Sequence, residues 1–255
     1  MQTGRAEAFV EKAIPQGVGL ARVRPVRRHR ASPASPIVGY LDRLWNRHAE
    51  LTAGEVATYI PELASADPAA FGICVATVDG AVYETGDTTA RFTLQSLSKP
   101  LAYGIALERH GDVGVRARIG VEPSGEAFNA ISLDPATGAP RNPMINAGAI
   151  AATWLAGEGL ERPFEHILDV VSRCAGRRLA VSGAVFRSEQ ATGFRNRAIA
   201  HLLRNAGVIE GDPDAASDLY FRQCAVEVDC RDLGVIAATL ANGGVNPLTG
   251  ERALH

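Results

Sequence analysis

Apolar side chains recur at helical spacing along most of the chain. Between residues 37 and 49 one side of the pattern is apolar and the other is charged, which predicts an amphipathic helix. The same spacing predicts further helices around residues 149–155, 164–174, 198–203 and 233–240. Two polar runs, at 188–197 and 217–220, interrupt the pattern. We expect surface loops at both.

Two runs rich in strand-forming residues surround an Asp-Gly pair. They cover residues 71–78 and 81–85, with Asp79-Gly80 between them. This arrangement is a strong signal for a β-hairpin. A second turn, Gly86-Asp87, leads to Phe92 and an apolar helical run that ends near Gly111. The predicted order is therefore strand, turn, strand, loop and helix.

The start of that helix is constrained by Pro100. Proline lacks a backbone N–H and disfavours helical geometry at the residue before it, so it is tolerated only in the first helical turn. The helix is therefore predicted to begin at Ser96 or later. Asn146 lies further along, in a loop with small residues on either side. It either permits a close approach of the backbone there or caps a helix.

Composition predicts one folded region preceded by a basic extension. The chain has 255 residues, of which 46% are apolar, and this is ample for a buried core. Residues 1–30 carry seven Lys or Arg against two Glu, a net charge of +5, whereas the whole chain has a charge of −2. We predict a flexible basic extension at 1–36, ending in a Pro/Ser-rich linker, and a domain at 37–255.

The charge balance and hydropathy exclude several classes of protein. A net charge of −2 gives no reason to expect nucleic acid as a partner. No apolar run is long enough to cross a bilayer, and the basic extension lacks the apolar core of a secretory signal. We expect a cytoplasmic protein that binds no membrane. An Arg-rich organellar leader remains the alternative.

The cysteines and histidines do not form a metal-binding pattern. The four cysteines show no C-x-x-C pair, and the six histidines show neither an H-E-x-x-H motif nor an i,i+4 pair. We expect buried free thiols and no metal site.

Ser96 and Lys99 are the candidate catalytic pair. They are separated by one helical turn, so both side chains would project from the same face of a helix that begins near Ser96. A neutral lysine can remove the proton of a serine hydroxyl, and a helix start offers N–H groups to an oxyanion. The pair predicts acyl transfer. By itself, S-x-x-K is also typical of a solvated first helical turn.

Longer motifs identify a family. Several blocks between residues 38 and 252 occur together and in the order of the serine-dependent glutaminases, which this sequence closely resembles. The blocks are Tyr59-Ile-Pro-Glu-Leu63, Phe92-Thr-Leu-Gln-Ser-Leu-Ser-Lys99, Phe128-Asn129, Asn142-Pro-Met-Ile-Asn-Ala-Gly-Ala-Ile150, Ser188-Glu189, Arg195-Asn196, Tyr220-Phe-Arg-Gln-Cys224 and Leu240-Ala-Asn-Gly-Gly-Val-Asn-Pro247.

The resemblance implies a fold and a reaction. The fold is that of the β-lactamases and penicillin-binding transpeptidases, an α/β (α+β) architecture with an antiparallel sheet packed against helices and a helical subdomain. The reaction is hydrolysis of the side-chain amide of L-glutamine to L-glutamate and ammonia, with Ser96 as nucleophile and Lys99 as the group that activates it. An acyl-enzyme ester hydrolysed by water needs no cofactor. The family also implies a homo-oligomer.

The resemblance further implies which residues hold the substrate. A zwitterionic amino acid needs a carboxylate for its ammonium group, a role that suits Glu189, and donors for its carboxylate, a role that suits Asn146 and Asn196. The complete set of implied substrate-binding residues is Tyr59, Ser96, Asn146, Glu189, Asn196 and Tyr220.

One family feature is not found in the sequence. In this fold the last sheet strands follow the helical region, and in this family they bring a further tyrosine and a K-S-G-type strand that helps to form the oxyanion hole. The chain ends at His255, so we expect these C-terminal strands to be absent and one sheet edge to be uncovered. The alternatives to an active glutaminase are an impaired fragment or pseudoenzyme and, less favoured because no S-x-N element is seen, a penicillin-interacting serine acyl transferase.

Overall fold

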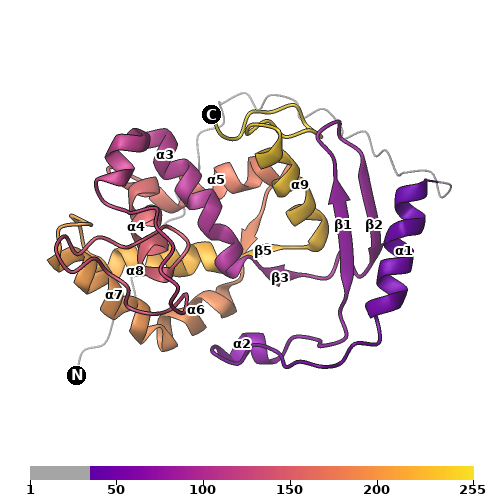
Figure 1. The fold of residues 1–255 in the computed structure, drawn as a ribbon, viewed down its shortest axis with the longest axis horizontal. Coiled ribbons are helices and arrows are strands. Elements are labelled where there is room, and N and C mark those ends of the chain that lie inside the picture. The colour runs from indigo at the N-terminus through magenta and orange to yellow at the C-terminus, as the bar shows by residue number, and fades with distance from the viewer. Residues whose placement is uncertain (1–34) are drawn as a thin grey trace, which may run out of the picture.

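The computed structural model describes residues 35–255, so most of the predicted basic extension lies outside the described residues. Figure 1 shows the arrangement of the elements. In chain order they are α1 (Pro36–His48), α2 (Pro61–Ala64), β1 (Gly72–Ala76), β2 (Val82–Gly86), β3 (Phe92–Thr93), the 3₁₀ helix η1 (Gln95–Ser98), α3 (Lys99–Arg116), α4 (Asn146–Gly157), α5 (Pro163–Ala175), β4 (Ala180–Val181), α6 (Gly183–Thr192), α7 (Phe194–Asn205), α8 (Pro213–Cys224), β5 (Val226–Val228) and α9 (Cys230–Ala241).

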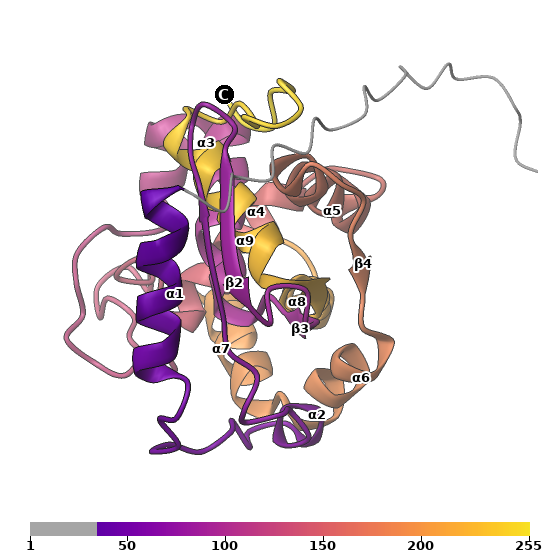
Figure 2. The ribbon, with the colours of Figure 1, turned by 90° about the vertical axis from the view of Figure 1, so that its right-hand side faces the viewer.

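The predicted hairpin lies between two helices. Strands β1 and β2 pair antiparallel, with Gly72 opposite Gly86 and Ala76 opposite Val82. Helix α1 packs against β2 and helix α9 against β1. Figures 1 and 2, which differ by a quarter turn, both show the hairpin between these helices. The result is a layer of sheet covered on both sides.

Helix α1 forms where the amphipathic pattern predicts it. The Ser35 hydroxyl accepts a hydrogen bond from the N–H of Ile37, and Pro36 occupies the first helical position, where no N–H is needed. On the inner face, Trp45 Nε1 donates to the carbonyl of Phe71 at 2.9 Å. This contact fixes the helix against the chain that enters β1.

The rest of the molecule is organised around α4. This helix is rich in alanine and glycine, and nearly all of its residues are buried. A helix that is apolar on all sides is expected in a core. It contacts α3, α5, α7 and α8, and Figure 1 shows these helices grouped on the side of the molecule away from the hairpin. Asn146, the first residue of α4, therefore lies at the end of the central helix of this part of the molecule.

A small sheet connects the two parts. Strand β5 pairs antiparallel with β3 on one side and with β4 on the other. Figure 1 shows β3 and β5 in the middle of the molecule. Because η1 follows β3 directly, this pairing sets where the Ser96 turn begins. The N–H of Leu94 also donates to the carbonyl of Val226 at 2.8 Å, just beyond the paired residues.

One prediction about secondary structure is wrong. The polar runs at 188–197 and 217–220 are not surface loops, because they belong to α6, α7 and α8. The predicted end of the apolar helix near Gly111 is confirmed. That glycine has φ 69° and ψ 168°, which are not helical, and a second helical stretch of α3 follows it as far as Arg116. None of the helices within residues 35–255 combines the length and the apolar composition needed to span a membrane.

Candidate active site

Ser96 and Lys99 lie at the junction between η1 and α3. Ser96 is exposed, whereas Lys99 is only 3% exposed. Residues three apart eclipse one another in a 3₁₀ helix, so both side chains project from one side of this turn. Pro100 occupies the second position of α3, where its missing N–H costs no helical hydrogen bond. The sequence argument that placed the helix start near Ser96 is therefore consistent with this turn.

The Lys99 amine is buried among neutral groups. Nζ donates to the carbonyl of Met144 at 3.0 Å and to Asn146 Oδ1 at 2.9 Å, and it lies 5.5 Å from the centroid of the Phe128 ring. Burial lowers the pKa of Lys99 because it disfavours the charged ammonium. The shift makes the neutral amine, which is the form that can accept a proton, easier to reach than in a solvent-exposed lysine.

Asn146 connects the lysine to a second asparagine. It is the first residue of α4, but its side chain makes no capping hydrogen bond. Instead, Oδ1 accepts from Lys99 and Nδ2 donates to Asn196 Oδ1 at 3.0 Å. The N–H groups of Met144 and Ile145, just before the helix, donate to Asn142 Oδ1. The capping alternative for Asn146 is therefore wrong.

A pocket of about 290 Å³ opens above this turn. All six predicted substrate-binding residues line it, although they come from six separate segments of the chain. Lys99 is not among the lining residues, but its amine contacts two of them, Asn146 and Phe128. The lining consists of Tyr59, Ile60, Gln95, Ser96, Phe128, Asn129, Asn146, Glu189, Thr192, Gly193, Arg195, Asn196, Tyr220 and Cys224.

Glu189 and Tyr220 form the buried wall of the pocket. Glu189, on α6, is 6% exposed, and Tyr220, on α8, is 3% exposed. Burial raises the pKa of Glu189 to about 7, and a hydrogen bond from Gln95 opposes part of that rise. Burial also raises the pKa of Tyr220 well above its usual value. The wall therefore places a carboxyl group, whose charged form a cationic ligand would stabilise, next to a neutral phenol.

Tyr59 lines the same pocket, from the segment that precedes α2. Its ring is 60% exposed, and its hydroxyl donates to Gln95 Oε1 at 3.2 Å. Taken alone, this tyrosine would be expected in the core, so its exposed position is informative. It is held at the mouth of the pocket, beside the residue that precedes Ser96.

Eight further lining residues are not in the predicted set. Six of them fall inside motif blocks that carry the family resemblance, which is the signal that the sequence offered for them: Ile60, Gln95, Phe128, Asn129, Arg195 and Cys224. The other two, Thr192 and Gly193, lie in no block. Arg195 is exposed and donates to the carbonyl of Asn129 at 3.2 Å. It adds a cationic group to the pocket, near the N-terminal end of α7.

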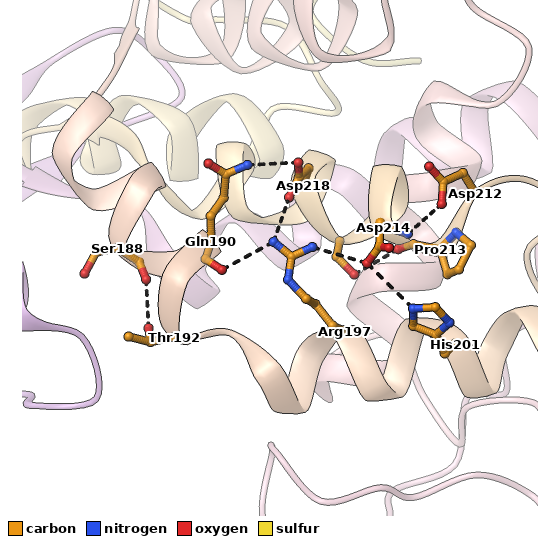
Figure 3. Close-up of polar contacts among 10 residues, drawn as sticks. Ser188, Gln190, Thr192, Arg197, His201, Asp212, Pro213, Asp214 and Asp218 are labelled. Carbon is orange, nitrogen blue, oxygen red and sulfur yellow. Dashed lines mark hydrogen bonds and ion pairs between the residues drawn. The ribbon is translucent and has the colours of Figure 1, made fainter.

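Behind the pocket, Arg197 connects three helices, as Figure 3 shows. Its guanidinium bonds to Asp214 and Asp218 on α8 and to the carbonyl of Gln190 on α6, each at 3.3 Å. It also lies 5.4 Å from the centroid of the Phe221 ring. Gln190 adds a 2.9 Å hydrogen bond to Asp218. These contacts hold together the helices that carry Glu189, Asn196 and Tyr220.

In the described part of the chain, no group of three or more His, Cys, Asp or Glu side chains is arranged to hold a metal ion. Its cysteines are free thiols, and two of them, Cys174 and Cys224, are buried.

Solved structures define the class of fold. The crystal structure of Mglu in its glutamate form matches with a TM-score of 0.81 and 43% identity, over 86% of this chain and 51% of that one. A probable glutaminase, ybaS, matches with a TM-score of 0.82 and 41% identity, over 86% of this chain and 72% of that one. The fold is the β-lactamase-like α/β architecture that the sequence predicts.

Sequence comparisons then give the family. The family model described as Glutaminase matches residues 54–255. A glutaminase of Nostoc sp. is 52% identical over 222 residues, which cover 87% of this chain and 66% of that relative. Glutaminase 2 of Bradyrhizobium diazoefficiens is 49% identical over 244 residues, which cover 91% of this chain and 38% of that relative. The chain belongs to the glutaminase family, and it spans just under two thirds of the length of the Nostoc relative.

Proposed function

We propose that this chain hydrolyses the side-chain amide of L-glutamine to L-glutamate and ammonia through an acyl-enzyme on Ser96. The observation that carries the proposal is the convergence of the six predicted substrate-binding residues on one pocket, where Lys99 donates a hydrogen bond to one of them, Asn146. Family membership adds support, and so does the solved relative Mglu, which was crystallised in a glutamate form.

The first step forms the ester. Ser96 Oγ attacks the side-chain carbonyl carbon of glutamine while its proton passes to the neutral amine of Lys99. The resulting tetrahedral oxyanion collapses, and the electron pair of the C–N bond goes to the departing nitrogen. That nitrogen takes the proton from Lys99 and leaves as ammonia. The lowered pKa of Lys99 supports this role, because a charged ammonium could not accept the serine proton.

The second step releases glutamate. A water molecule attacks the ester carbon as Lys99 accepts one of its protons. The C–O bond to Ser96 then breaks, and Ser96 Oγ recovers a proton from Lys99. Glutamate leaves with the new carboxyl group. The lysine returns to its neutral state, and no cofactor takes part.

The pocket chemistry suits a free amino acid. In our proposal the Glu189 carboxylate pairs with the substrate ammonium, and Asn146 and Asn196 donate to its carboxylate. Tyr59 and Tyr220, which also line the pocket, complete the set of residues that hold the substrate. Asn146 has a second role, because its Oδ1 accepts from Lys99 and so orients the amine.

Ammonia release from L-glutamine tests the reaction. The 255-residue chain is assayed beside its Ser96→Ala variant, with L-asparagine as the control substrate. Glutamine-specific release that the variant loses supports the proposal. No release by a folded sample would favour the alternative, a family member that does not catalyse, and turnover of a β-lactam without turnover of glutamine would favour a penicillin-interacting acyl transferase.

We also infer a homo-oligomeric, cytoplasmic protein with a domain at 37–255 behind a basic extension at 1–36. Free thiols support a reducing compartment. Light scattering, cell fractionation and limited proteolysis test these three statements. A monomer by scattering, recovery outside the cytoplasm, or protection of the extension from protease would each contradict one of them.

A further inference from the structure

A buried chain of polar groups runs from α4 through α8 to the Ser96 turn. Gln223 Nε2 donates to Ser98 Oγ at 3.0 Å, and Gln223 Oε1 accepts from Thr153 Oγ1 at 3.0 Å. Ser98 and Thr153 are 0% exposed, and Gln223 is 1% exposed. Polar groups that are buried this completely are costly unless each is hydrogen-bonded, so the three constrain one another.

The chain ends on the residue before Ser96. Ser98 Oγ donates to the carbonyl of Gln95 at 2.7 Å. Gln95 has φ 48°, the one positive φ at a non-glycine residue within 35–255. This conformation costs free energy for a residue with a side chain and persists only where the surroundings hold it.

The Gln95 carbonyl controls the geometry of Ser96. The carbonyl of Gln95 and the N–H of Ser96 belong to one planar trans peptide, so they point in opposite directions. Because the carbonyl is drawn towards buried Ser98, the Ser96 N–H is directed the other way, towards the exposed side of the turn on which Ser96 lies. The same peptide plane also fixes the position of the Ser96 Cα, from which the side chain departs.

We propose that Ser98 and Gln223 are positioning residues that hold the strained Gln95–Ser96 peptide in its reactive orientation. The inference rests on the proposed function, because it assigns a purpose to the Ser96 turn. Neither residue lines the pocket, and neither has a role in the proposed reaction. Gln223 suits the position because a carboxamide can donate at one atom and accept at the other.

Helix α8 therefore contributes two residues to the proposed site, one in the pocket and one behind the Ser96 turn. Tyr220 lines the pocket, and Gln223, on the same helix, fixes the turn that carries the nucleophile. Thr153 is itself a residue of α4, and its single hydroxyl proton is placed between Gln223 Oε1 and the carbonyl of Ala149 in the same helix. The network therefore couples α4, α8 and η1.

Hydrogen exchange measures the positioning without any assay of activity. The variants are Ser98→Ala, which removes the donor to Gln95, and Gln223→Met, which keeps the length of the side chain without its polar ends. Ser217→Ala is the matched control, because Ser217 is also 0% exposed and donates to a backbone carbonyl, that of Pro213 at 2.9 Å. We expect faster exchange in peptides covering residues 94–98 for both variants and unchanged exchange there for the control.

Kinetics measures the consequence. Misplacement of a reacting group by about 1 Å costs on the order of 100-fold in rate. We expect kcat, per folded site, to fall about 100-fold in Ser98→Ala and about tenfold in Gln223→Met, with KM within about threefold of the parent chain. A purely structural role would lower the thermal midpoint of the variants and the control alike, and would leave kcat per folded site unchanged.

The outcomes separate this inference from the proposed function. If the parent chain releases no ammonia, the proposed function fails, and the exchange of residues 94–98 alone decides the inference. If the parent chain is active, parental kcat together with parental exchange in both variants overturns the inference. If Ser98→Ala does not fold, Gln223→Met decides it by the same two measurements.

Discussion

Lys99 Nζ and Asn146 Oδ1 are joined by a 2.9 Å hydrogen bond across 47 positions of sequence, and both side chains are buried. A neutral amide beside the lysine keeps the lone pair of the amine available. A carboxylate at the same place would instead favour the ammonium form. The choice of asparagine at position 146 therefore bears on the protonation state of Lys99.

Asn146→Asp tests this relationship. We expect activity at neutral pH to fall, because the new carboxylate raises the pKa of Lys99. The limb on which kcat rises with pH should move upward by about one to three pH units, as expected for an opposite charge at this distance. The measurement is a pH–rate profile of the variant beside Asn146→Ala. A limb shifted equally in both variants would contradict the electrostatic explanation.

Glu189 predicts a pH-dependent affinity for glutamine. Its pKa is about 7 in the free protein, so it loses its charge as the pH falls through neutrality. A neutral carboxyl binds the substrate ammonium poorly, and we expect KM to rise about tenfold between pH 8 and pH 6, following the ionised fraction of the carboxyl. Initial rates over a range of glutamine concentrations measure this. In Glu189→Gln, KM should be high at both pH values, and a pH-dependent KM in that variant would assign the effect elsewhere.

The same carboxylate should destabilise the fold at alkaline pH. Its folded-state pKa is raised above the ordinary value of 4.5, so folding favours the protonated form. The wild-type chain should match Glu189→Gln in stability below about pH 4 and lose stability as the pH rises from there to about 7. Above that pH the variant should be more stable by about 3 kcal/mol, since one pKa unit corresponds to 1.36 kcal/mol. Urea unfolding at pH 4 and pH 8 checks the sign, and a more stable wild type at pH 8 would reverse it.

Patterns of apolar residues predict the elements that bury one face and fail for those that direct polar groups inward. Helices α1, α5 and α9 and the β1–β2 hairpin follow their expected periodicities. Helices α6 and α8 do not, because they bury Glu189, Ser217 and Gln223 towards the pocket and the core. Polar residues on an inner face erase the apolar period, so both segments resemble loops in the sequence.

The short strands, the pocket residues and the buried network differ in how far the sequence could predict them. Strands β3, β4 and β5 have two or three residues each, which is too short for a period of two to be recognised. The residues of the pocket came from the family resemblance, because no local pattern connects Tyr59 with Tyr220. The Ser98–Gln223–Thr153 network gave no sequence signal, since its members are brought together only by the packing of α4 and α8.

Arg197 offers a test of how far the pocket depends on the helices behind it. Arg197→Met keeps much of the contact with Phe221 but removes the bonds to Asp214, Asp218 and Gln190. We expect KM to rise several-fold with a smaller change in kcat, and stability to fall by about 1–2 kcal/mol, because these partly exposed hydrogen bonds are each modest. Arg116→Met, which breaks only an exposed pair with Asp112, is the matched control and should leave stability essentially unchanged. Equal changes in KM and stability in the two variants would show that the pocket does not depend on the contacts of Arg197.

Gly193 joins α6 to α7 at a point where no side chain fits. A Cβ atom there would overlap the Phe221 ring and the carbonyl of Glu189. The backbone has φ −75°, so any cost of Gly193→Ala is steric rather than conformational. We expect the free energy of unfolding of Gly193→Ala to fall by about 1–3 kcal/mol, typical of overpacking, and KM to rise because Glu189 is displaced.

Gly39→Ala, in α1, is the control. The nearest neighbour of an added Cβ there is the flexible end of the Arg43 side chain, so this variant should be more stable by about 0.5–1 kcal/mol. Thermal unfolding and glutamine kinetics of both variants decide the matter, and parental KM in Gly193→Ala would show that the helix junction tolerates the extra methyl group without moving the wall of the pocket.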